Sequence, residues 1–389
     1  MAALTGFRII DLTNAVAGSS STKLLTDLGA DVVKIEHPAG GDFTRTLMPF
    51  IYQSHNRNKR SLAVDLRTAD GVALVRRLAN SADVFVQSLR PGAATALGLD
   101  RAALTAENPR LIYASFSAFG AHGPSHARRG VDAVAQAESG MVQVQGRLLG
   151  NVSYVDTAAG LALSQAILAA LLHRERTGQV DSIEVNLLDT ALYMQSAPLA
   201  EFSVTGRVTD QNEYLTRYPV VGIFPACDGE FQLAAYWEHD WIALCEIVDR
   251  SDLLTDERFD TPAQRRQHTT ALRAILTEAF QVQPRRHWVG RLTDAGILCG
   301  SVRHYNEIVA DARSGRNESF EQLEIDGTAT TFVRPPFRLN GQPCSPSRPA
   351  PALGADNRSI LAEAGYSPDE IAAMVEQGVV GPAADSTVR

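Results

Sequence analysis

The sequence predicts an α/β fold, in which a doubly wound domain on a parallel sheet is combined with a smaller α+β domain. Three observations lead to this prediction. Short β-branched runs alternate with amphipathic helical segments through the first half of the chain. A polar stretch without a clear period follows at 203–217. The next block, roughly 216–300, combines a hairpin pattern with helical segments.

The parallel sheet is predicted from the first segments. Residues 7–12 (FRIIDL) and 31–36 (DVVKIE) are typical of strands, and between them lie the small-residue loop AGSSST (17–22) and a helix ending at Gly29. Such a βαβ unit implies a right-handed crossover between parallel strands. The same alternation predicts strands at 61–66, 83–89, 109–120 and 179–188, and helices at 68–82 and 187–202.

The later segments have a different pattern of apolar and polar residues. Residues 220–237 predict a hairpin that turns at Asp228-Gly229. Apolar residues at helical spacing then predict a helix with one buried face, made of Leu272, Ile275, Leu276, Ala279 and Phe280. A second polar stretch follows at 310–328, and Ser367 is placed to cap a closing helix at 367–380.

Composition excludes several classes of protein. The 389 residues are 45% hydrophobic and 21% charged, with a net charge of −8 and no basic block, so nothing indicates nucleic-acid binding. The four cysteines are scattered, which disfavours a zinc site or a disulfide framework and favours a reducing, cytoplasmic setting. No signal-peptide pattern opens the chain. The apolar run 158–172 is shorter than the ~20 residues of a membrane span, so we expect a buried core helix.

The loop after the first predicted strand is a candidate ligand crevice. It opens a helix whose NH groups could hold a phosphate, and Glu36 ends the next strand, where dinucleotide folds place a ribose-binding acid. Only Gly18 lies in the turn, and the G-x-G-x-x-G fingerprint is absent. An NAD-dependent oxidoreductase is therefore disfavoured.

Cations are concentrated at HNRNKRS (55–61), which contains Arg57, Lys59 and Arg60, while Arg90 follows a predicted strand end. Arginine offers bidentate donors to phosphate and lysine a mobile point charge. Such a run is usually a solvated loop, and the residues alone leave both interpretations open.

Two acidic residues are candidates for chemistry. Asp156 precedes the apolar helix, where an aspartate acts either as a helix N-cap or as a nucleophile. A carboxylate at a helix N-terminus is expected to be held ionised by the dipole and the NH groups. Asp132 follows Gly130 in a glycine-rich segment and is as readily a turn or cap residue as a catalytic one.

Several motifs together resemble the class III CoA-transferases, a family that includes formyl-CoA:oxalate and carnitine CoA-transferases. They cover nearly the whole chain in order, and they are GADVVKIEHPAGGDFTR, NRNKRSLAVDLRTADG, RPGAATALGLDRAALTAENPRLIYASFSAFGAHGP, RTGQVDSIEVNLLDTAL, DAGILCGSV and PAPALGADNRSILAEAGYS. The resemblance implies a Rossmann-like large domain built from both chain ends, an inserted smaller α+β domain and an interlocked homodimer. The implied ranges are 1–200 and 329–389 for the large domain, 217–300 for the small domain, and 201–216 and 301–328 for two linkers.

The resemblance also implies an activity, the transfer of CoA from an acyl-CoA to a small carboxylic acid. The family nucleophile corresponds to Asp156 in YVDTAAG, which would form a mixed anhydride and then an aspartyl-CoA thioester. CoA enters as part of the substrate, and no metal or permanently bound cofactor is implied. Asp132 would lie near the reacting thioester. The residues implied to bind CoA are Ala17, Gly18, Lys59, Arg60 and Arg90.

The acid pocket and the alternatives are less tightly specified. Val16, Tyr236 and Glu238 are predicted to line the pocket for the acid. The expected partners are acyl-CoA, a small carboxylate and a second copy of the chain, with no nucleic acid and no membrane. An α-methylacyl-CoA racemase is the alternative enzyme, but Val131 stands where racemases need a histidine base. A CoA-binding homologue without turnover is the alternative of another class.

Overall fold

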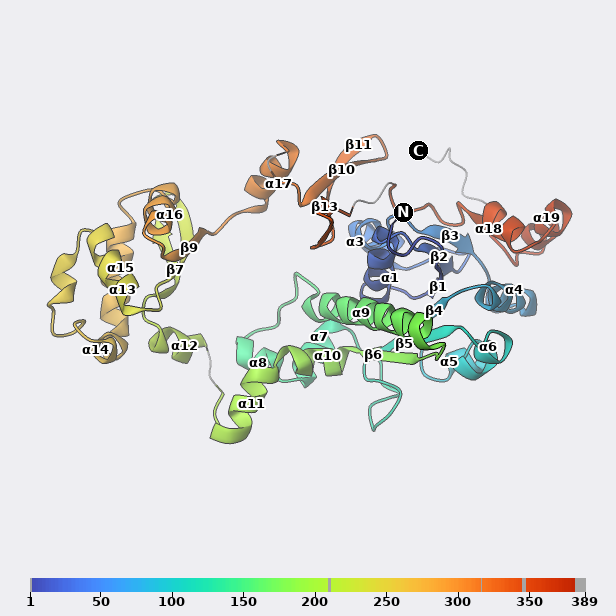
Figure 1. Cartoon of the computed structure of the whole chain (residues 1–389), viewed down its shortest axis with the longest axis horizontal. Helices are drawn as coiled ribbons and strands as arrows, with labels where there is room; N and C mark the ends of the chain where they lie inside the picture. The colour runs from blue at the N-terminus through green and yellow to red at the C-terminus, as the bar shows by residue number, and fades with distance from the viewer. Residues whose placement is uncertain (1, 209–210, 316, 345–347, 382–389) are drawn as a thin grey trace. The chain divides into compact units, whose positions relative to one another are not determined.

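The computed structural model describes residues 2–208, 211–315, 317–344 and 348–381 (Figure 1). It divides into two compact units. The large unit comprises residues 1–142, 147–196 and 312–389, and the small unit comprises 143–146 and 197–311. Both ends of the chain therefore belong to the large unit. The predicted linker limits stay predictions, and the end of the predicted large domain, 382–389, lies outside the described residues.

The large unit is built on a parallel sheet. Its strand order is β3-β2-β1-β4-β5-β6. The strands are β1 (Arg8–Leu12), β2 (Asp31–Glu36), β3 (Arg60–Ala63), β4 (Val84–Gln87), β5 (Ile112–Ser117) and β6 (Ser182–Asn186). This is the order of Rossmann-type, doubly wound sheets, so the α/β prediction is confirmed. The chain reverses its direction of winding between β1 and β4, and ligands of such sheets bind at the carboxyl ends of the strands beside that point.

Helices cover both faces of this sheet. They are α1 (Ala17–Asp27), α2 (Thr44–Leu47), α3 (Pro49–His55), α4 (Ala69–Asn80), α5 (Ala93–Ala96), α6 (Arg101–Glu107), α7 (Asp132–Glu138), α9 (Tyr154–Thr177), α10 (Leu187–Met194), α18 (Asn357–Glu363) and α19 (Pro368–Glu376). Two further helices, α8 (Met141–Gln145) and α17 (Tyr305–Arg313), contain limits between the units, and a third limit falls after the first residue of α11 (Ser196–Thr205). Two short hairpins, β10 (Phe320–Ile325) with β11 (Thr328–Val333) and β12 (Arg338–Leu339) with β13 (Gln342–Pro343), precede α18.

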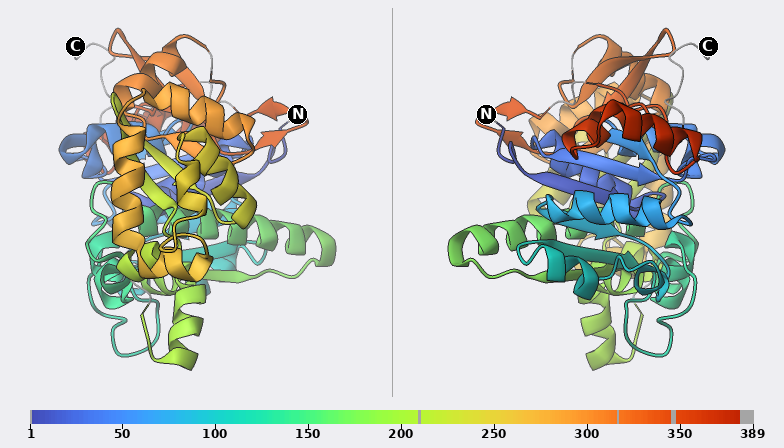
Figure 2. Two further views of the ribbon diagram at one scale, coloured as in Figure 1. Left: turned by 90° about the vertical axis from the view of Figure 1, so that its left-hand side faces the viewer. Right: turned by 90° about the vertical axis from the view of Figure 1, so that its right-hand side faces the viewer.

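Successive strand residues point to opposite faces, and this alternation creates two cores. Ile9 and Val32 pack in one core with apolar residues of α1 and α9. Their neighbours Ile10 and Val33 pack in the other core with residues of α4, α6 and α18. The right-hand view of Figure 2 shows α4 and the red C-terminal helices on that second face. The strands β1 to β4 are therefore buried on both sides, while the edge strand β6 has exposed residues.

The small unit is the predicted α+β block. Its sheet contains β7 (Val221–Ala226), β8 (Gly229–Ala234) and β9 (Leu298–Ser301), and the first two form the predicted hairpin at Asp228-Gly229. Its helices are α11 (Ser196–Thr205), α12 (Gln211–Arg217), α13 (Glu238–Ile247), the 3-10 turn η1 (Ser251–Leu254), α14 (Pro262–Gln267), α15 (Thr269–Phe280) and α16 (Arg285–Asp294). The predicted apolar face of α15 is confirmed, because Leu272, Leu276 and Phe280 are buried in the core of this unit.

One expectation about local structure was wrong. The small residues at 17–22 form the first turns of α1 instead of a loop. Two of their hydroxyls bond back to carbonyls within the helix, from Ser20 to Ala17 and from Thr22 to Gly18 and Ser19, so these polar side chains are accommodated in a buried helix. The polar stretch 203–217 is largely helical, and 310–328 contains the end of α17 and most of one hairpin. By contrast, Ser367 caps α19 as predicted, in a capping box with Glu370.

Helix α9 is the described helix that is long and apolar enough to cross a membrane by length and composition. One such helix is weak evidence, because core helices of soluble proteins have the same properties. Leu163 and Ile167 of α9 are fully buried against the sheet. The packing therefore supports the prediction of a core helix.

Candidate active site

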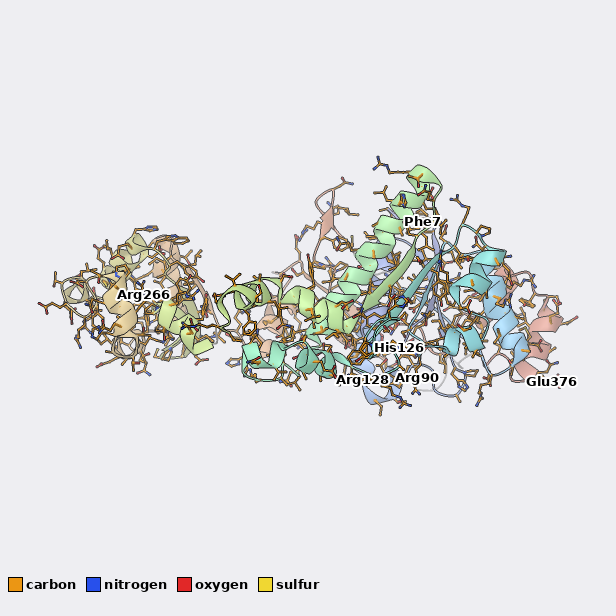
Figure 3. All side chains as sticks on the ribbon, turned by 90° about the horizontal axis from the view of Figure 1, so that it is seen from below. Phe7, Arg90, His126, Arg128, Arg266 and Glu376 are labelled. Atoms are coloured by element: carbon orange, nitrogen blue, oxygen red, sulfur yellow. The ribbon has the colours of Figure 1, made fainter. Side chains whose placement is uncertain are left out.

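Two loops meet where the chain reverses its winding at the carboxyl edge of the sheet. One follows β1 and leads into α1, and the other follows β4 and contains Arg90. The backbone NH of Asn14 donates to the Ser88 hydroxyl at 3.1 Å, and the NH of Ser88 donates to the carbonyl of Leu12 at 3.3 Å. These bonds join the loops on which Ala17 and Arg90 were predicted to bind a ligand. The Arg90 side chain is exposed (Figure 3).

The start of α1 offers its backbone to this crevice. Ala17 and Gly18 are its first two residues, and the first NH groups of a helix have no acceptor within the helix. A Cβ added to Gly18 would lie 2.5 Å from the Cβ of Thr13, so only glycine permits this close approach to the end of β1. The side chains of Val16 and Ala17 are buried. Any contact that Ala17 makes with a ligand here is therefore a backbone contact.

Asp132 and Asp156 lie together although 24 residues separate them. Asp156 is the third residue of α9, and Asp132 is the first residue of α7. Oδ2 of Asp132 accepts from the backbone NH of Val155 at 2.8 Å and from that of Asp156 at 2.9 Å. Asp132 therefore caps α9 from outside the helix, while the N-cap residue Ser153 makes no side-chain cap. The alternative that Asp156 itself caps α9 was wrong.

The carboxylate of Asp156 has no hydrogen-bond donor among the described residues, and it is partly buried. Burial, followed by the like charge of Asp132, raises the pKa of Asp156 to about 7. We had expected the helix terminus to hold Asp156 ionised. The two NH groups nearest to it are bonded to Asp132 instead, so they do not stabilise its charge.

Gln136 is part of this arrangement and was not identified from the sequence. It is fully buried and its side-chain amide donates to Oδ1 of Asp132 and to the carbonyl of Leu149 at 3.0 Å. Its amide oxygen accepts from the NH of Leu149 at 3.0 Å. Gln136 therefore orients the carboxylate of Asp132, which caps α9, and fixes the position of Leu149 in the segment before α9. Its spacing of four residues from Asp132 on a helix was the available signal.

An apolar cluster brings the three helix starts together. Ala17 of α1, Ala135 of α7, and Val155 and Ala159 of α9 pack in one buried cluster. Gly160 allows this approach, because an added Cβ would lie 2.2 Å from the Ser20 hydroxyl and 2.9 Å from the Ala17 carbonyl. The structure therefore brings Asp132 and Asp156 to the same region as the start of α1.

Lys59 and Arg60 are placed differently from the other predicted residues. Lys59 is fully buried, and its ammonium donates to Asp11, to Asn56 and to the Ser19 carbonyl, at 2.8 to 2.9 Å. Arg60 opens β3 and bonds Asp31 and Glu363, at the amino ends of the strands. Contact of either side chain with a CoA phosphate at the carboxyl edge would require a different arrangement.

The small unit has a pocket that contains two of the predicted acid-pocket residues. Tyr236 and Glu238 line it, together with the aromatic rings of Tyr218, Trp237 and Trp241. Its volume is about 320 Å³, and Arg217, Arg265 and Arg266 also line it. Glu238 is paired with Arg265, whose guanidinium lies 4.9 Å from the ring centre of Trp241. Arg266 makes no ion pair among the described residues, so its charge is available to an anion (Figure 3).

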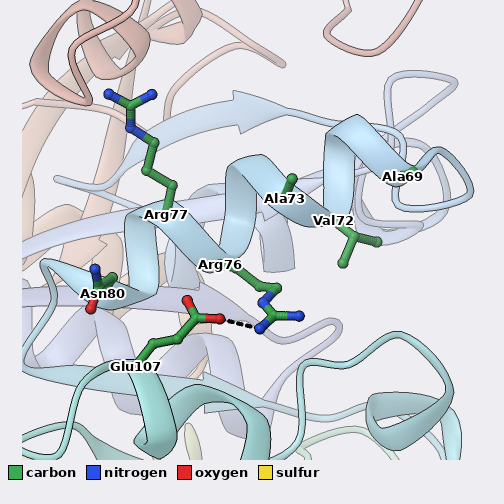
Figure 4. Close-up of a pocket in the computed structure, with 7 residues that line it drawn as sticks. All are labelled: Ala69, Val72, Ala73, Arg76, Arg77, Asn80 and Glu107. Atoms are coloured by element: carbon green, nitrogen blue, oxygen red, sulfur yellow. Dashed lines mark hydrogen bonds and ion pairs between the residues drawn. The ribbon is translucent and has the colours of Figure 1, made fainter.

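A further surface pocket lies on the other face of the sheet, between α4 and α6. Figure 4 shows Arg76 and Glu107 as an ion pair across it. Its remaining lining residues, such as Val72 and Asn80, come from α4. None of the predicted site residues lines it. The described residues contain no group of three or more histidine, cysteine or acidic side chains placed to bind a metal.

Comparison with known proteins identifies similar chains over most of this length. The family profile described as CoA-transferase family III matches residues 4–357. The chain is 32% identical to the succinate–glutarate CoA-transferase of Agrobacterium fabrum, over 92% of this chain and 95% of that protein. It is 31% identical to the human succinyl-CoA:glutarate CoA-transferase, over 97% and 90% of the two chains.

A solved structure shows the same fold. The crystal structure of a CAIB/BAIF family protein from Brucella suis has a TM-score of 0.83 and 29% sequence identity to this chain. The match covers 93% of this chain and 99% of that one.

Proposed function

Because the chain belongs to CoA-transferase family III and is an enzyme of the CoA-transferase type, we propose that it moves CoA from an acyl-CoA to a small carboxylic acid with Asp156 as nucleophile. The observation that carries this proposal is the state of Asp156. It is a partly buried carboxylate at the start of a core helix, and no described residue donates a hydrogen bond to it. Both oxygens are therefore available to attack a thioester carbonyl.

The reaction runs in four steps. Asp156 attacks the acyl carbon of the donor, and CoA leaves as a thiolate, which gives a mixed anhydride. The thiolate attacks the aspartyl carbonyl, which releases the donor acid and forms an aspartyl-CoA thioester. The carboxylate of the acceptor attacks this thioester and expels the thiolate again, which gives a second anhydride. The thiolate then attacks the acceptor's acyl carbon, which forms the new acyl-CoA and regenerates Asp156.

Asp132 contributes to the reaction through its effect on the nucleophile Asp156. The burial of Asp156, followed by the charge of Asp132, raises the pKa of Asp156 to about 7, which makes the ionised form more basic than an ordinary aspartate and still populated at neutral pH. The bonds of Asp132 to the two NH groups of α9 also hold the nucleophile's backbone in place. We therefore assign Asp132 as a positioning residue.

The CoA moiety is proposed to bind at the carboxyl edge of the sheet. The first NH groups of α1, at Ala17 and Gly18, face this edge and suit a phosphate. Arg90, on the adjoining loop, supplies an exposed cation. Lys59 contributes to the fold around this site through its bonds to Asp11 and Ser19, while Arg60 lies at the opposite edge of the sheet.

The pocket of the small unit is proposed to hold the carboxylic acid. Tyr236 and Trp237 supply an aromatic wall, and Arg217 and Arg266 are among the positively charged residues that line it. The relatives named above act on succinate and glutarate, which carry a second carboxylate. We propose dicarboxylic acids as the acceptor class, with the second carboxylate on these arginines.

We also propose a cytoplasmic homodimer with interlocked subunits. The contact between subunits is supported by three exposed apolar side chains around one groove between α9 and α10, beside the edge strand β6: Leu161, Tyr193 and Met194. A second copy is the proposed occupant of this groove. Sedimentation should show a dimer, and a monomer at micromolar concentration would refute it.

The central test is covalent trapping. The purified chain is incubated with succinyl-CoA, treated with hydroxylamine, and mapped by peptide mass spectrometry. The expected product is a hydroxamate at Asp156, and Asp156→Ala should lose transfer while it still binds CoA. A trapped adduct at another residue, or transfer by Asp156→Ala at the normal rate, would show that the mechanism is wrong.

A further inference from the structure

Four charged side chains lie buried under the loop that leads into α1, and the reaction above uses none of them. They are Asp11, Lys34, Asp42 and Lys59, and each is fully buried. Removing a charged group from water costs several kcal/mol, so buried charges persist only when they are paired and hydrogen-bonded. Their bonds therefore indicate what this group of charges holds in place.

Lys34, in the middle of β2, bonds the loop that leads into α1. Its ammonium donates to the Thr13 carbonyl at 2.8 Å and to the Ser19 hydroxyl at 3.3 Å. It also pairs with Asp42 at 3.2 Å. One lysine thus bonds the residue that follows β1 and a residue in the first turn of α1.

Lys59 holds the other end of the same segment. Its ammonium donates to the Ser19 carbonyl at 2.9 Å, to Asp11 at 2.9 Å and to Asn56 at 2.8 Å. A lysine has three donors, so all of them are used. Burial lowers the pKa of Lys59 to about 8, against the attraction of Asp11.

The two carboxylates bond the loop backbone directly. Asp11 accepts from the NH of Thr13 at 3.0 Å and from its hydroxyl at 2.6 Å. Asp42 accepts from the NH of Ala15 at 3.1 Å. Ala15 has a φ of 65°, in the left-handed region that a residue with a Cβ rarely adopts. Such a conformation persists when its surroundings impose it, and the bond to Asp42 does so here.

We propose that Asp11, Lys34, Asp42 and Lys59 are positioning residues that hold the segment 13–19 in the shape that binds the CoA moiety. Lys59 then acts on CoA from beneath the loop, through Ser19 and Asp11, and not by touching a phosphate. This inference rests on the proposed function only in taking the start of α1 as the CoA site.

The chain contains a matched control for a purely structural role. Lys23 and Asp27 form a second buried ion pair, at 2.6 Å, within α1 itself. Among the described residues, Lys23 makes no side-chain bond to the segment 13–19, and its ammonium pairs with Asp27 instead. Lys34→Met and Lys23→Met therefore remove the same buried charge from neighbouring places, and only the first removes bonds to the loop.

The experiment compares these two variants with the wild type as full-length proteins. Amide hydrogen exchange over 13–19 is measured without ligand, and CoA binding is measured by calorimetry. If the competent loop population falls to about a tenth, the Kd for CoA rises about tenfold. Lys34→Met should show this rise and faster exchange at 13–19, while KM for acyl-CoA rises more than kcat falls. Lys23→Met should lose stability with little change in either readout.

The outcomes separate this inference from the proposed function. Equal effects of Lys34→Met and Lys23→Met on CoA binding, or unchanged exchange at 13–19, would overturn it. If Lys34→Met does not fold, Asp42→Asn replaces it, and a weaker rise in Kd with the same local exchange is expected. If hydroxylamine traps no adduct at Asp156, but Lys34→Met still raises the Kd for CoA and speeds exchange at 13–19, the mechanism is refuted and the positioning role is supported.

Discussion

Replacing Asp156 by asparagine is predicted to stabilise the fold at alkaline pH while it removes the nucleophile. The pKa of Asp156 is raised from 3.8 to about 7 by burial and then by Asp132. Between these values the folded carboxyl keeps a proton that the unfolded chain has released. Folding stability therefore falls as pH rises through this window, and the loss is complete above the folded pKa. Asparagine does not ionise, so the Asp156→Asn variant does not lose stability in this way.

The size of the effect follows from the shift. About two pKa units of the window lie between pH 5 and pH 7, and each unit is worth about 1.4 kcal/mol. Because Asp156 keeps some contact with water, we expect a net effect of about 2 kcal/mol. The stability difference between Asp156→Asn and the wild type should widen by that amount from pH 5 to pH 8.

The assay is urea unfolding of both proteins at pH 5 and pH 8, at one protein concentration so that any dimer contributes equally. Asp70→Asn is a control, because it removes an exposed acid from the first turn of α4. A difference between Asp156→Asn and the wild type that is the same at both pH values would refute the reasoning. So would a variant that is less stable than the wild type at pH 8.

Three further predictions concern neighbouring features. Asp132→Asn removes the like charge beside Asp156, so the acid limb of the kcat/KM profile should move to lower pH; an unmoved limb contradicts this. Gly160→Ala places a Cβ 2.2 Å from the Ser20 hydroxyl, so it should lower the free energy of unfolding by about 1 to 3 kcal/mol. An unchanged midpoint in urea unfolding would contradict this close packing. Arg266→Ala should raise KM for dicarboxylate acceptors about tenfold, as the loss of a charged hydrogen bond does, and equal KM values would remove Arg266 from the acid pocket.

The sheet could be predicted from the sequence because its information is local. Strand runs such as 31–36 and the alternation with helices are visible within short windows, and they predict a parallel sheet. The hairpin at Asp228-Gly229 and the Ser367 cap are equally local and were confirmed. The first turns of α1 were misassigned because the small residues at 17–22 have weak helix propensity, and packing against α9 decides their conformation.

The state of the candidate site, unlike the sheet, depends on residues that are distant in the sequence. Asp156 could be selected from YVDTAAG, but its state depends on Asp132, whose bonds to α9 cross 23 and 24 residues. A local window shows an acid at a helix start and predicts stabilisation of its charge. It cannot show that another acid already occupies the NH groups that would provide this stabilisation.

Sequence alone determined the fold class, the family resemblance and the identity of Asp156 as the candidate nucleophile. Tertiary structure decided what the adjacent cations Lys59 and Arg60 do. Lys59 bonds Asp11, 48 residues away, beneath the loop that precedes α1, while Arg60 bonds Glu363, 303 residues away, at the amino ends of the strands. Neighbouring residues at the start of a strand point in different directions, and which distant partner each one meets depends on the packing of the whole sheet.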